Sequence, residues 1–195
     1  MRNLRSFSIY PPLYFVVALS LFVLPFQLVF GWIIAAMIHE LSHLLMLILL
    51  KVKVHSVSVG ITGTLIKTEP MSPVKELCCA LAGPIGGLLP LVILRITPYV
   101  ALSAAIQSFY NLLPVYPQDG GRAVKSAATC LFGESAAQKI SFILSAAVII
   151  LTTLCGCWLS YRYRLGILPI IFPLVPLLRN VRKNSLQRMK KNCRI

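Results

Sequence analysis

The sequence predicts an all-α polytopic membrane protein with about six transmembrane helices and a small membrane-associated β-hairpin between the second and third helices. Of its 195 residues, 57% are hydrophobic. Apolar runs close to the ~20 residues that cross a bilayer recur along the chain. One segment between two such runs instead alternates apolar and polar residues with a period of two. Only five residues are Asp or Glu, against 19 Lys or Arg.

The first two helices are expected at 12–28 and 30–50. The apolar stretch that they cover is too long for one span, and Pro25 and Gly31 favour a break within it. Two arginines precede the stretch, but no small-residue cleavage site follows and the hydrophobic run continues. The first segment is therefore interpreted as a retained helix rather than a signal peptide.

A β-hairpin is expected at about 52–67. Val alternates with Lys, His and Ser along this segment, and Gly60 and Gly63 indicate turns. A strand pair cannot lie exposed to lipid, because its edges would carry unsatisfied backbone groups. The hairpin is therefore expected at the membrane interface or against the helices.

The third and fourth helices are expected at 73–94 and 99–114. Ser72 is a suitable N-cap for the third helix, and Pro73 is a suitable first residue. The glycine-rich segment 83–87 indicates a packing face where another backbone approaches closely. The remaining expected segments are a fifth helix at 138–159, a sixth helix at 165–178, which ends the membrane core of residues 1–178, and a basic tail at 179–195.

Six spans would place both termini on the same side of the membrane. With this arrangement, every Lys and Arg except Arg95, Arg162 and Arg164 lies on the side of the termini. Positive residues favour the cytoplasm, so both termini and the hairpin are expected to face it. The formal net charge of +14 is accordingly expected to meet the anionic membrane surface and not nucleic acid.

The main candidate site is the His-Glu-Leu-Ser-His run at residues 39–43, within the second expected helix. Residues at i and i+4 project from one face of a helix, so His39 and His43 can bind one zinc ion. Glu40 can hold and deprotonate a water molecule there. Ionisable groups are costly within a membrane and mark function. A hydrolytic zinc site needs a third protein ligand, and Asp119 is the only other acid expected within the membrane.

The chain resembles the site-2 protease family of intramembrane zinc metalloproteases in three motifs, which occur in the matching order. They are His-Glu-Leu-Ser-His at 39–43, Ala-Gly-Pro-Ile-Gly-Gly at 82–87, and Asn-Leu-Leu-Pro-Val-Tyr-Pro-Gln-Asp-Gly-Gly-Arg at 111–122. The resemblance covers nearly the whole chain. It is strongest to the branch typified by stage IV sporulation protein FB, which has a six-helix core and cleaves a membrane-associated precursor of a sporulation sigma factor. Three residues depart from the family pattern: Ser42, Gly87 and Gln118.

The resemblance implies a role for each matching residue. The implied Zn²⁺ ligands are His39, His43 and Asp119. Glu40 would be the general base that later protonates the leaving amine. Asn111 and Pro114 would help to orient the substrate or to stabilise the transition state. The expected hairpin would present an edge that pairs with an unwound substrate.

These features predict an intramembrane zinc metalloendopeptidase that cleaves a membrane-spanning or membrane-associated protein near the cytosolic face. A sporulation sigma-factor precursor is one candidate substrate. The other expected partners are the lipid bilayer and regulatory membrane proteins, and the expected location is a bacterial cell membrane. Two alternatives stay open: a metal-ion transporter whose ligands bind a passing ion, and a catalytically inactive membrane binding partner.

Overall fold

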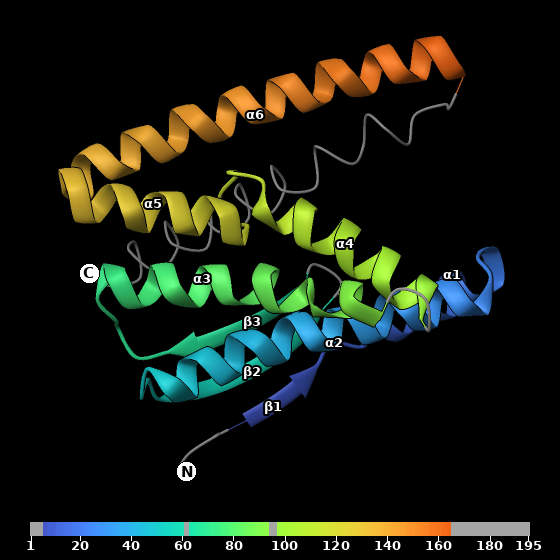
Figure 1. The fold of residues 1–195 in the computed structure, drawn as a ribbon, viewed down its shortest axis with the longest axis horizontal. Coiled ribbons are helices and arrows are strands. Elements are labelled where there is room, and N and C mark those ends of the chain that lie inside the picture. The colour runs from blue at the N-terminus through green and yellow to red at the C-terminus, as the bar shows by residue number, and fades with distance from the viewer. Residues whose placement is uncertain (1–5, 61–62, 94–96, 165–195) are drawn as a thin grey trace, which may run out of the picture. The chain divides into compact units, whose positions relative to one another are not determined.

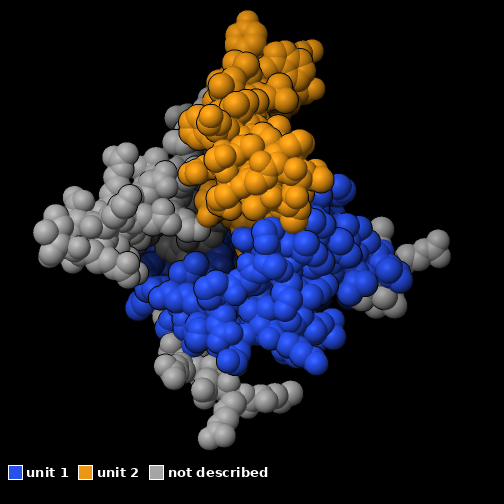
Figure 2. Space-filling view, turned by 90° about the vertical axis from the view of Figure 1, so that its left-hand side faces the viewer, with its two compact units in different colours: residues 1–112 blue, residues 113–195 orange. Residues whose placement is uncertain are grey.

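The computed structural model describes residues 6–60, 63–93 and 97–164. The chain divides into two compact units, Met1–Leu112 and Leu113–Ile195, which are coloured separately in Figure 2. The first unit contains a small β-sheet and the helices α1 to α4, and the second contains α5 and α6 (Figure 1).

Two apolar helices, α1 (Pro12–Val23) and α2 (Phe26–Leu49), follow a short N-terminal strand. Pro25 separates them, because it has no N–H to donate and its backbone is extended at ψ 136°. The structure thus has the expected break at this proline. Gly31, however, lies inside α2 and not between two helices. A Cβ on Gly31 would lie 2.8 Å from the carbonyl oxygen of Tyr99, so the glycine permits a close backbone approach.

Three strands form one sheet in the order β1-β2-β3. Their bounds are Ser6–Ile9 for β1, Val54–Gly60 for β2 and Gly63–Thr68 for β3. β2 and β3 form the antiparallel hairpin that the alternating segment predicted, and an ion pair of 3.2 Å joins Lys53 Nζ to Glu69 Oε1 beside it. β1 pairs with β2 in parallel and was not expected. Its four residues are too few to show a clear alternation.

The first unit ends with two helices and a 3-10 turn between them. The bounds are Pro73–Gly87 for α3, Leu89–Ile93 for the 3-10 turn η1, and Pro98–Leu112 for α4. Ser72 and Pro73 hold the expected cap positions, although the Ser72 hydroxyl makes no capping hydrogen bond. The third helix was expected to continue to residue 94, but Pro90 cannot donate the next helical hydrogen bond. α2, α3 and α4 all contact one another.

The second unit contains α5 (Asp119–Phe132) and α6 (Glu134–Tyr163), which pack against each other. No helix was expected between residues 114 and 138, so the prediction was wrong for α5. Small and polar residues dominate the sequence of α5, so a search for apolar spans does not find it. α6 extends beyond both ends of the expected helix at 138–159. It buries small residues spaced four apart: Ala137, Ser141 and Ser145.

Three helical segments in the described part of the chain are long and apolar enough to cross a membrane. They are Phe26–Leu49, Pro73–Val92 and Glu134–Tyr163, while the apolar helix α1 is shorter. The expected sixth helix at 165–178 and the tail at 179–195 lie outside the described residues. The six α-helices of the described residues are therefore not the six expected spans. The fold is nevertheless mainly helical, with the predicted hairpin between the second and third helices.

Candidate metal centre

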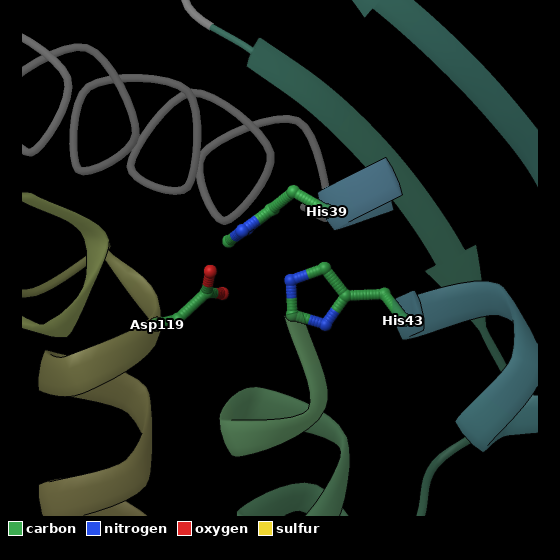
Figure 3. Close-up of side chains that lie close together, drawn as sticks. All are labelled: His39, His43 and Asp119. Atoms are coloured by element: carbon green, nitrogen blue, oxygen red, sulfur yellow. The ribbon is translucent and has the colours of Figure 1, made fainter. Parts of the chain in front are cut away.

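One face of α2 is buried along most of the helix, and this face carries both histidines. Its residues recur every four positions and are Gly31, Ala35, His39, His43 and Leu47. Leu41 and Leu45 lie on the other side of the helix and are exposed. The rings of His39 and His43 project from successive turns of α2, with their centroids 4.9 Å apart (Figure 3). α2 thus directs the two imidazoles toward the interior of the first unit.

The ring of His43 is oriented by the backbone carbonyl of Cys79 in α3. His43 Nδ1 lies 2.8 Å from this carbonyl oxygen. A carbonyl oxygen only accepts hydrogen bonds, so Nδ1 carries the ring proton. In the neutral ring, Nε2 then keeps the lone pair with which imidazole binds a metal ion. Metal-binding histidines usually donate their second nitrogen to such an acceptor.

The ring of His39 is oriented by the side chain of Asn111 in α4. Asn111 Nδ2 lies 3.3 Å from His39 Nε2. An amide NH₂ group only donates, so Nε2 accepts and the neutral ring carries its proton on Nδ1. Both histidines therefore have the same tautomer, with the lone pair on Nε2. The structure thus brings three of the predicted site residues together: His39, His43 and Asn111.

The glycine-rich segment of α3 forms a wall against which the histidine rings lie. A Cβ on Gly83 would overlap the ring of His43. A Cβ on Gly87 would lie 3.2 Å from His39 Nδ1, and one on Gly86 would overlap the Ser42 side chain between the two histidines. The packing face predicted at 83–87 is therefore present, and it contacts the candidate ligands themselves.

Asp119 is the first residue of α5, in the second unit. Its side chain is only 13% exposed, and its Oδ1 lies 3.5 Å from Nη1 of Arg122, one turn further along the helix. Gly120 and Gly121 are both buried. A Cβ on Gly121 would overlap the preceding backbone at residues 115–116, so the turn before α5 is tight.

The two other predicted site residues lie on α2 and in the segment before α5. Glu40 is half-buried and follows His39 directly on α2. The carbonyl oxygen of Pro114 accepts a hydrogen bond of 3.4 Å from the hydroxyl of Ser145 in α6. The same hydroxyl accepts the N–H of Tyr116 at 3.0 Å. α6 therefore fixes the backbone of the segment that leads to Asp119.

Three groups beside the candidate ligands were not predicted as part of the site. They are the carbonyl of Cys79, the hydroxyl of Ser108 and the guanidinium of Arg122. A backbone carbonyl gives no signal in the sequence. Ser108 lies three residues before Asn111, on the same face of α4, so it could have been found from Asn111. The spacing of Arg122 from Asp119 is that of a helical ion pair.

Comparison with known proteins finds a likeness in structure alone. The sequence matches no family model and no curated protein. Among solved structures, the chain is similar to a site-2 protease from Methanocaldococcus jannaschii, with a TM-score of 0.65 and 18% identity. The match covers 90% of this chain and 90% of the archaeal chain. The two chains therefore share a fold.

Proposed function

We propose that this chain is an intramembrane zinc metalloendopeptidase of the site-2 protease family. The observation that carries the proposal is the buried pair His39 and His43. Both rings lie on one face of a helix that is long enough to cross a membrane, and both keep the Nε2 lone pair. Two buried imidazoles in an apolar helix favour a functional role over a packing role. The fold shared with the archaeal site-2 protease also supports the proposal.

Asp119 is the proposed third zinc ligand. In support, the Asp119 side chain is only 13% exposed, and a buried carboxylate needs a cationic partner or a metal ion. Two imidazole nitrogens and one carboxylate oxygen are a donor set that suits zinc. Three protein ligands leave the fourth zinc position for water or substrate, as hydrolysis requires. The ion pair with Arg122 would hold the Asp119 carboxylate in one orientation.

Three residues of the chain have separate roles in the proposed reaction: Glu40, Asn111 and Pro114. Bound zinc would supply Lewis-acid chemistry, polarising the scissile carbonyl and lowering the pKa of a water molecule toward ~7. Glu40 takes the proton from the attacking water and later gives it to the leaving amine. Asn111, which lies beside His39 Nε2, donates its amide hydrogens to the substrate carbonyl as negative charge develops there. Pro114 contributes through its fixed backbone.

The proposed substrate is a membrane-spanning or membrane-associated protein that is cut near the cytosolic face. β3 ends the sheet, and its outer side has no strand partner among the described residues. An extended substrate segment can add to such an edge through main-chain hydrogen bonds. Because peptide bonds in a helix are shielded, unwinding would precede cleavage. A sporulation sigma-factor precursor is one substrate of this kind, in a bacterial cell membrane with both termini in the cytoplasm.

Zinc analysis and cleavage assays of the wild type and Glu40→Gln test this function together. The variant should bind as much zinc as the wild type, because Glu40 is not a proposed ligand. Its cleavage of a co-expressed membrane-bound precursor should fall by at least ~100-fold, as expected for loss of a general base. Glu134→Gln, which changes an exposed acid at the start of α6, is the matched control and should cleave normally.

Each alternative predicts a different result for these proteins. Wild-type protein that is purified without zinc after metal-replete growth would refute the metalloprotease. A transporter would keep its ion flux in vesicles after Glu40→Gln, since its three ligands are unchanged. An inactive binding partner would show the same cellular phenotype with and without Glu40.

A further inference from the structure

Ser108 is a buried serine on α4 whose hydroxyl has no hydrogen-bond partner in the described part of the chain. The residue is 1% exposed. Burying a hydroxyl without a hydrogen bond costs free energy, so native proteins rarely leave one unsatisfied. The position of Ser108 therefore calls for an explanation.

Ser108 lies next to His39 in a gap that a glycine leaves open. A Cβ built on Gly87 of α3 would lie 2.5 Å from Ser108 Oγ and 3.2 Å from His39 Nδ1. Both atoms therefore border the same small space, which exists because residue 87 has no side chain. α2, α3 and α4 each contribute one of these three residues.

The proton on the His39 ring belongs to the nitrogen that borders this gap. Asn111 donates to Nε2, so the neutral ring carries its hydrogen on Nδ1. A serine oxygen has two lone pairs and can accept this N–H while its own hydrogen rotates away. The carbonyl of Cys79 serves His43 Nδ1 in the same way at 2.8 Å.

We propose that Ser108 is a positioning residue of the metal centre. In the structure, Ser108 Oγ does not yet make this hydrogen bond. A rotation of the Ser108 side chain across the gap beside Gly87 would let Oγ accept the Nδ1–H of His39, and so hold the ring with Nε2 directed toward the metal ion. This inference rests on the proposed zinc site. Ser108 itself contacts neither metal nor substrate. It strengthens zinc binding by fixing the tautomer and orientation of a ligand, as outer partners of metal-bound histidines do.

Zinc affinity of the purified full-length protein, measured by competition with a chromophoric chelator, tests the inference. S108A should bind zinc about 10- to 100-fold more weakly than the wild type, the usual effect of losing an outer partner. S103A is the matched control, because Ser103 is also buried on α4 but lies more than one turn away. It should keep wild-type affinity. Thermal unfolding of both variants shows whether the protein is still folded.

Cobalt substitution gives a readout that is independent of activity and that general destabilisation would not change. The visible bands of protein-bound Co²⁺ report the geometry of its ligands. S108A should shift these bands because the His39 ring can reorient, whereas S103A should leave them as in the wild type.

The His39 tautomer can also be measured directly in the metal-free wild type, without any substitution. The chain has only three histidines, so selective ¹⁵N-histidine labelling resolves each ring by NMR. We expect the His39 proton on Nδ1. A proton on Nε2, or S108A with wild-type affinity and cobalt bands, would overturn the role of Ser108 and leave the proposed function standing. Wild-type protein that binds no zinc would overturn both.

Discussion

The two histidine rings are constrained by groups that can form only one kind of hydrogen bond. The Cys79 carbonyl only accepts and the Asn111 amide only donates, so both rings keep the lone pair on Nε2. The spacing of His39 and His43 predicted a shared face, and the structure shows it. The tautomers could not be predicted, because the Cys79 carbonyl meets His43 only when α3 packs against α2.

The proposed third ligand can be tested at the level of one residue. Asp119→Asn keeps the size of the side chain and removes its charge, so the fold should survive. Zinc affinity should fall by at least ~100-fold, since a ligand is lost and not an outer partner. Metal-to-protein ratios after dialysis measure this change, with Glu134→Gln as the control. An Asp119→Asn protein that retains one zinc ion at wild-type affinity would require a different third ligand.

Asn111 should affect catalysis without affecting metal content. Asn111→Ala removes the amide that would donate to the substrate carbonyl, but it removes no proposed ligand. Cleavage should fall by about 10²- to 10³-fold, as for other lost donors of this kind. Zinc content, measured on the same preparation, should equal that of the wild type. Unchanged cleavage would show that Asn111 only orients His39 in the metal-free protein.

Among the elements, α3 shows most clearly what the sequence could and could not predict. Its glycines predicted a close approach, and the structure shows that the approaching groups are the side chains of His43, Ser42 and His39. Which side chains meet the glycines depends on how α2 and α3 align. A short stretch of sequence does not reveal this alignment. α5 was missed for a different reason. Its residues pack against α6 through small side chains, and such a helix gives no strong apolar signal.

The glycine wall of α3 can be tested by adding single methyl groups. Gly83→Ala would force the His43 ring to move, whereas Gly86→Ala would force a similar movement of Ser42, which is not a ligand. Overpacking at either position should destabilise the protein by about 1–3 kcal/mol. Zinc affinity should fall markedly in Gly83→Ala and much less in Gly86→Ala, by chelator competition. Equal losses would mean that a general displacement of α3 causes the effect.

At the scale of the whole molecule, the composition predicted a membrane protein. It was a poorer guide to the number of helices that span the membrane. Three segments of the described chain are long and apolar enough to cross a bilayer, including α2 with its two histidines. α1 and α4 are shorter, with 12 and 15 residues. Hydropathy identifies apolar length, but it does not distinguish α4, which packs against both α2 and α3, from a helix that spans the membrane. The orientation of the chain in the membrane is predicted by the distribution of its basic residues and not by its fold.

The distribution of bases predicts which ends of the chain face the cytoplasm. Arg162 and Arg164 lie at the end of α6 and belong to the few bases on the expected outer side, whereas seven bases follow in 179–195. A green fluorescent protein fused after Ile195 should therefore fluoresce. Alkaline phosphatase fused after Arg164 should be active, because it folds only outside the cytoplasm. Replacing both arginines with Gln is the control for local charge and should change neither signal, since the nine bases of the expected cytoplasmic side that precede Arg162 are present in both fusions. The reverse pattern of signals would place the histidine pair near the outer face and would rule out cleavage at the cytosolic side.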